Sequence, residues 1–98
     1  MPKHPSNRLV LVRIRQGVSL DGLAALMSGD KSAWGAAGNS IARLVLEGRG
    51  EAMVPVAIVQ QATASSEGVE AILDNFHLED AETQRPLLWE LLRNDSDG

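Results

Sequence analysis

Residues 8–15 (RLVLVRIR) restrict the fold of this 98-residue chain more than any other segment, because a run so rich in branched side chains favours a β-strand. Alternate side chains of a strand point to opposite faces. One face would carry Val10, Val12 and Ile14, and the other Leu9, Leu11, Arg13 and Arg15. The second face changes from apolar to cationic along its length. We therefore expect one strand near the N-terminus.

Three later segments have the spacing of amphipathic helices. The first follows Ser19, a suitable N-cap residue. The second begins near Asn39 and ends at Gly48, and the third follows Ser65 or Ser66. Their apolar stripes are Leu20, Leu23, Ala24 and Met27; Ile41, Leu44 and Val45; and Val69, Ile72, Leu73 and Phe76.

The segment from residue 40 to residue 60 leaves the fold class open. If residues 41–47 are helical, the fold is mainly α, with one N-terminal strand that pairs with the same strand of a second chain. We favour this reading because polar residues repeat at helical spacing there. A hairpin around residues 48–50 would instead give an α+β fold with a small antiparallel sheet packed by helices. Its strands would lie near residues 8–15, 41–47 and 53–60. Pro55 fits the start of a helix or an edge strand.

The residue types that most enzymes and metal sites use are scarce. Cysteine is absent, which excludes a thiol nucleophile and a cysteine-based zinc site and favours a reducing, cytoplasmic location. The two histidines, His4 and His77, are far apart, and the HExxH, GxGxxG and P-loop motifs are missing. We expect no catalytic residue, metal or cofactor. No apolar run approaches the roughly 20 residues that span a bilayer, so no membrane partner is expected.

Charge is distributed unevenly between the two halves of the chain. Residues 1–50 contain seven Lys or Arg and three Asp or Glu, a net charge of +4. Residues 51–98 contain two Lys or Arg and ten Asp or Glu, a net charge of −8. The net charge of the whole chain is therefore −4. Such a split indicates either two surfaces with different partners or two halves that attract each other within one fold.

The order of elements over residues 8–48 resembles the ribbon–helix–helix family of DNA-binding regulators, since a strand and a short helix precede a helix that opens with Asn39-Ser40-Ile41-Ala42-Arg43. In that family, strands of two chains pair into a ribbon that enters the major groove. The resemblance implies a dimer whose strand residues Arg8, Arg13 and Arg15 contact DNA. It also implies that Asn39 and Ser40 bind a phosphate at a helix N-terminus.

The acidic half ends in an apolar run. We expect Asp80 to cap a further helix, which Pro86 interrupts before residues 87–92. Three large side chains of that helix, Leu88, Trp89 and Leu92, are candidates for contact with a protein partner, because tryptophan often anchors such interfaces. The alternative is that they complete the core of this chain or the seam of a homodimer.

These features divide the chain into four regions. We expect a disordered lead-in at residues 1–7, a basic DNA-binding region at 8–50, an acidic helical region for a protein partner or oligomerisation at 51–93, and a disordered tail at 94–98. The first functional hypothesis is a small dimeric DNA-binding regulator, of the antitoxin or mobile-element accessory type. The second is a phage- or mobile-element-type inhibitor or adaptor that binds only protein, through its acidic half.

Overall fold

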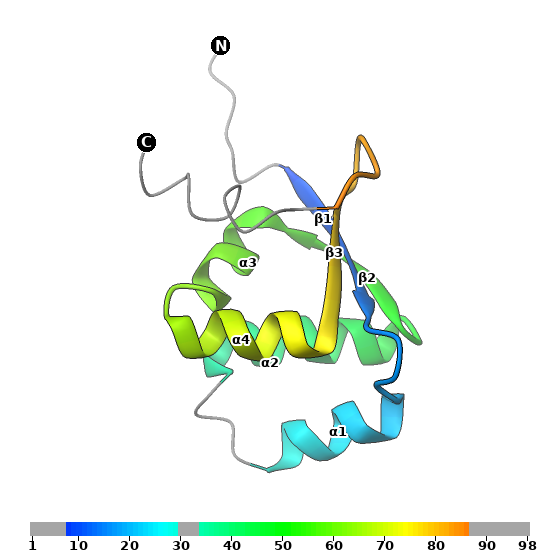
Figure 1. The fold of residues 1–98 in the computed structure, drawn as a ribbon, viewed down its shortest axis with the longest axis vertical. Coiled ribbons are helices and arrows are strands. Elements are labelled where there is room, and N and C mark those ends of the chain that lie inside the picture. The colour runs from blue at the N-terminus through cyan, green and yellow to red at the C-terminus, as the bar shows by residue number, and fades with distance from the viewer. Residues whose placement is uncertain (1–7, 30–33, 87–98) are drawn as a thin grey trace.

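The computed structural model describes residues 8–29 and 34–86 and shows an α+β fold (Figure 1). Within these residues, helices pack on one side of a three-stranded antiparallel sheet. The elements in chain order are β1 (Leu9–Ile14), α1 (Leu20–Ser28), α2 (Gly35–Glu47), β2 (Glu51–Pro55), α3 (Val56–Ala62), α4 (Ser66–Asn75) and β3 (Phe76–Asp80). The favoured prediction of a mainly α fold with one strand is therefore wrong.

The N-terminal strand lies in the middle of the sheet. The strand order is β2-β1-β3, and β1 pairs antiparallel with both neighbours. Because both edges of β1 are already hydrogen-bonded, this strand has no edge left for the ribbon expected between two chains. A central position also explains the composition of β1, since branched side chains are typical of strands with neighbours on both sides.

The α+β alternative is correct in class but wrong in two of its strands. Residues 41–47 are helical, as part of α2, and not a strand. The segment 53–60 divides at Pro55, which ends the edge strand β2 and precedes the first residue of α3. Both readings of this proline therefore apply, because its fixed φ fits a strand end and a helix start.

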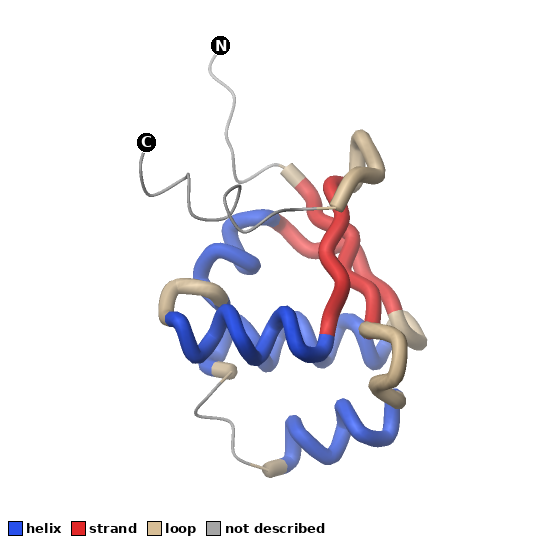
Figure 2. The backbone as a smooth tube through the Cα atoms, in the orientation of Figure 1, coloured by secondary structure: helices blue, strands red, loops and turns tan. Residues whose placement is uncertain are grey.

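One face of the sheet forms the core together with the helices (Figure 2). Val10 and Val12 of β1 are fully buried on this face, with Val54 of β2 opposite Val10 and Leu78 of β3 opposite Val12. The helices contribute their apolar stripes to the same cluster, with Leu23, Ile41, Val45, Val59 and Ile72 buried. The alternation read from the sequence thus matches the buried face of β1.

The third strand follows α4 without a connecting turn. Phe76 has extended backbone angles (φ −133°, ψ 153°), and its N–H still bonds to the carbonyl of Ile72 in the helix. Leu78 and Phe76 then join the core, and Phe76 meets Trp34 edge-to-face, with ring centroids 6.0 Å apart. Asp80, expected to cap a helix, is instead the last residue of β3.

Candidate protein-binding face

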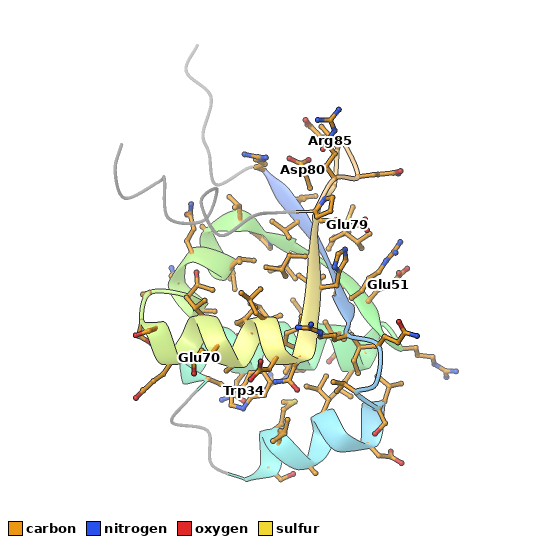
Figure 3. The ribbon with its side chains drawn as sticks, in the orientation of Figure 1. Trp34, Glu51, Glu70, Glu79, Asp80 and Arg85 are labelled. Carbon is orange, nitrogen blue, oxygen red and sulfur yellow. The ribbon has the colours of Figure 1, made fainter. Side chains whose placement is uncertain are left out.

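The sheet has a second face that no helix of the described chain covers. We call it the open face, and its side chains are those of Leu9, Leu11, Arg13, Glu51, Met53, Pro55, His77 and Glu79. They alternate along the strands with the buried residues of the core. Figure 3 shows two of them, Glu51 and Glu79, on the side of the sheet away from the helices.

One end of the open face is apolar. Leu11 lies opposite Met53 across the β1–β2 pair, and Leu9 lies opposite Pro55. Met53 is 52% exposed and Leu9 39% exposed, whereas Leu11 and Pro55 between them are half-buried. Neighbouring strands therefore present a continuous apolar patch to solvent, of the kind that marks an interaction surface when it is rimmed by polar groups.

The other end of the open face is charged. Arg13 lies 3.4 Å from Glu51 (Nε to Oε1) and 3.8 Å from Glu79 (Nη1 to Oε2). His77 Nε2 is 3.3 Å from the same oxygen of Glu79. Since most of these side chains are exposed, each pair contributes little to stability. The pairs do neutralise Arg13 with carboxylates from the neighbouring strands, and they give the apolar patch a polar rim.

A second ion pair fixes the end of the sheet. The Arg8 guanidinium donates to Oδ2 of Asp80, while Oδ1 accepts the backbone N–H groups of Glu82 (2.8 Å) and Thr83 (3.2 Å). The hydrogen bond from Arg8 and then those two N–H groups hold the pKa of Asp80 below its ordinary value. The carboxylate thus ties the first residue before β1 to the turn after β3.

The arginines predicted to contact DNA are all engaged by the acidic half of the chain. Arg8 pairs with Asp80, Arg13 lies between two glutamates, and Arg15 donates to the carbonyl of Leu73 in α4. Each of these three arginines therefore has an acceptor within the described chain. Of the two explanations for the charge split, attraction between the halves accounts for these three arginines.

The predicted phosphate-binding residues lie in a different place. Helix α2 starts at Gly35, so Asn39 and Ser40 belong to its second turn, where backbone N–H groups are already bonded within the helix. Asn39 is half-buried, and its Oδ1 is buried without a hydrogen-bond partner in the described structure. Helix α2 packs on the core side of the sheet, whereas Arg13 lies on the open face. The structure does not bring the five predicted residues into one surface.

The candidates for protein contact, Leu88, Trp89 and Leu92, lie outside the described residues. The apolar residues of the open face were not among the predicted site residues. A signal for two of them was present, because Leu9 and Leu11 share a strand face with Arg13. Met53 could be placed on this face only once the pairing of β1 with β2 was known, and no local sequence pattern predicts that pairing.

Comparison of the chain with family models, curated proteins and solved structures found no match. Residues 8–29 and 34–86 contain no group of three or more His, Cys, Asp or Glu side chains placed to hold a metal ion. No helix among them is long and apolar enough to cross a membrane.

Proposed function

We propose that this protein is a non-catalytic binding module, an adaptor or inhibitor, that uses its open face to hold an apolar segment of a partner protein. The observation that carries the proposal is the exposure of Met53 and Leu9 beside Leu11 on a sheet face that none of the described helices covers. An apolar centre with a charged rim is the usual anatomy of a protein interface.

The size of the open face limits what the partner presents. Three strands about 4.8 Å apart span about 14 Å, and five residues of about 3.4 Å each span about 17 Å. The product is about 240 Å², far below the roughly 800 Å² that each side of a stable globular interface buries. One helix, about 10–12 Å in diameter, fits this width. We therefore propose a single helix or extended segment as ligand, since the face is too small to hold a homodimer alone.

The pairing of the arginines also favours protein over DNA. A duplex is attracted by cations that are free to displace its counterions. Arg8 and Arg13 already have carboxylate partners, and Glu51 on the open face would face phosphates with a like charge. The protein-only hypothesis is therefore retained, with its binding surface moved from the acidic C-terminal half to the sheet.

The test begins with site-specific crosslinking in the source cells. A photo-crosslinking residue at Met53 is compared with one at Leu44, which is similarly apolar and 37% exposed but lies on α2. A protein crosslinked from Met53 alone is then purified, and its dissociation constant is measured. We expect Met53→Glu to weaken binding at least about tenfold, the loss of one interface anchor, and Leu44→Glu to change it less than about twofold.

Two results would overturn the proposal. The first is equal binding of the purified partner to wild type and Met53→Glu. The second is a shift of duplex DNA by the wild-type protein that weakens steeply as salt rises, which would restore the DNA-binding hypothesis. Circular dichroism of both variants serves as the control for folding.

A further inference from the structure

The charged end of the open face holds more carboxylates than cations within residues 8–29 and 34–86. Glu51 and Glu79 share the guanidinium of Arg13, at 3.4 Å and 3.8 Å. With His77 neutral, these side chains carry a net charge of −1. The side chain of Glu51 is 59% exposed, and that of Glu79 only 16%. A partner that covers this end therefore meets the carboxylate of Glu51.

The side chains of β1 and β2 on the open face form three rows across the two strands. The rows, as cross-strand pairs, are Leu9 with Pro55, Leu11 with Met53, and Arg13 with Glu51. Successive rows are two residues apart, which is about 6.8 Å along a strand. The first two rows are apolar and the third is charged. A ligand that lies along β1 must therefore change from apolar to polar at the same spacing.

A helix suits these rows better than an extended segment does. The face of a sheet offers no backbone groups, so an extended segment lying on it would leave its own N–H and C=O groups without strand partners. A helix bonds these groups internally, and its residues four apart lie on one side, about 6 Å apart along the axis. This distance is close to the spacing of the rows. Helix residues i and i+4 therefore fall over the two apolar rows, and residue i+7 or i+8 approaches the charged row.

We propose that the ligand of the open face is an amphipathic helix with apolar residues at i and i+4 and a Lys or Arg at i+7 or i+8. This inference rests on the proposed function and specifies its partner. The apolar pair packs on Leu9 and Met53, which are both exposed. The cation pairs with Glu51 and balances the net charge of that end, and its long side chain reaches the third row. Charge complementarity of this kind supplies specificity, since a helix with Glu at the same position meets a like charge.

Selection from a displayed library of helical peptides tests this partner. The library is selected on the full-length protein, and peptides that also bind Met53→Glu are removed. We expect the remaining peptides to be enriched in the proposed pattern of two apolar residues and a cation. The same selection on Glu51→Lys should enrich Asp or Glu at the position of the cation. Glu70→Lys, the same charge change on α4, is the matched control and should leave the preference for a cation unchanged (Figure 3).

Dissociation constants of the best selected peptide give the size of the effect. We expect Glu51→Lys to weaken binding about three- to tenfold and Glu70→Lys less than about twofold. A peptide with Glu in place of the cation should bind Glu51→Lys more tightly than it binds wild type, which also shows that this variant is folded. Peptides that depend on Met53 but show no preference for a cation would overturn this inference and leave the proposed function intact. The absence of any Met53-dependent peptide would contradict the proposed function and this inference with it.

Discussion

The close contact between α3 and α4 provides a test in which local propensity and packing predict opposite results. Gly68, in the first turn of α4, is buried, and its N–H bonds to the hydroxyl of the N-cap residue Ser65 at 3.0 Å. A Cβ atom added to Gly68 would lie 2.2 Å from the carbonyl oxygen of Ala62, the last residue of α3. We therefore expect Gly68→Ala to destabilise the protein, although alanine is the better helix former.

The magnitude follows from the distance that the backbone must move. An ordinary contact starts at 3.4 Å, so the two helix ends must separate by about 1.2 Å. Overpacking costs about 1–3 kcal/mol, with rigid backbone at the upper end. The propensity gain of about 1 kcal/mol offsets part of that cost. The free energy of unfolding should fall by about 2 kcal/mol, which lowers Tm by about 8–16 °C in a domain of this size.

Urea unfolding followed by circular dichroism measures this change. Glu70→Ala is the control, because this side chain is exposed on the same helix. That variant should stay within about 0.5 kcal/mol of wild type. If Gly68→Ala were as stable as wild type or more stable, the packing of α4 against α3 described above would be wrong.

Three further predictions follow from single features of the fold. The lowered pKa of Asp80 means that its stabilising effect is complete above about pH 4 and is lost as pH falls through its folded-state pKa. The urea midpoints of wild type and Asp80→Asn should therefore converge in acid. A difference that stays constant with pH would argue against a stabilising role of the Asp80 carboxylate. Ser65→Ala should lower the unfolding free energy by about 1 kcal/mol through loss of the N-cap bond, whereas Ser66→Ala should change it by less than about 0.5 kcal/mol. Ile41→Ala should cost about 2–4 kcal/mol in the same assay, and Leu44→Ala, at an exposed position on the same helix, clearly less.

Local patterns predicted the elements whose hydrogen bonds are local. Ser19 was expected as an N-cap and is confirmed by a bond from the backbone three residues later. The sequence placed Ser65 or Ser66 before the later helix, and in the structure Ser65 is its N-cap. Helix α2 starts at Gly35, earlier than predicted. The predicted start was near Asn39, because Gly35 and Gly38 are unfavourable inside a helix. In the structure the Trp34 side chain packs over Gly38, where an added Cβ would lie 2.9 Å from that of Trp34. That packing supplies a reason for glycine that helix propensity does not contain.

The strand β3 could not be predicted in the same way. Phe76 continues the apolar stripe of α4 at the next helical position, so the sequence pattern predicts that the helix includes it. In the structure Phe76 already has strand backbone angles and is the first residue of β3. The pairing of His77 with Arg13 joins residues far apart in the chain, and no turn residue near either of them predicts it. The open face depends on this pairing and on that of β2 with β1, so the site could not be found before the sheet was known.

Contacts between the two halves of the fold account for part of the uneven charge of the sequence. A count of charges registers an excess of cations before residue 50 and of anions after it, but it does not record which charges meet. In the fold, Arg8 and Arg13 meet carboxylates of the second half, and Arg15 meets a carbonyl of α4. These contacts link β1 to its neighbouring strands, to α4 and to the turn after β3. The apolar end of the open face lacks such partners in the described chain, which is why it, rather than the arginines, is the better candidate for a binding surface.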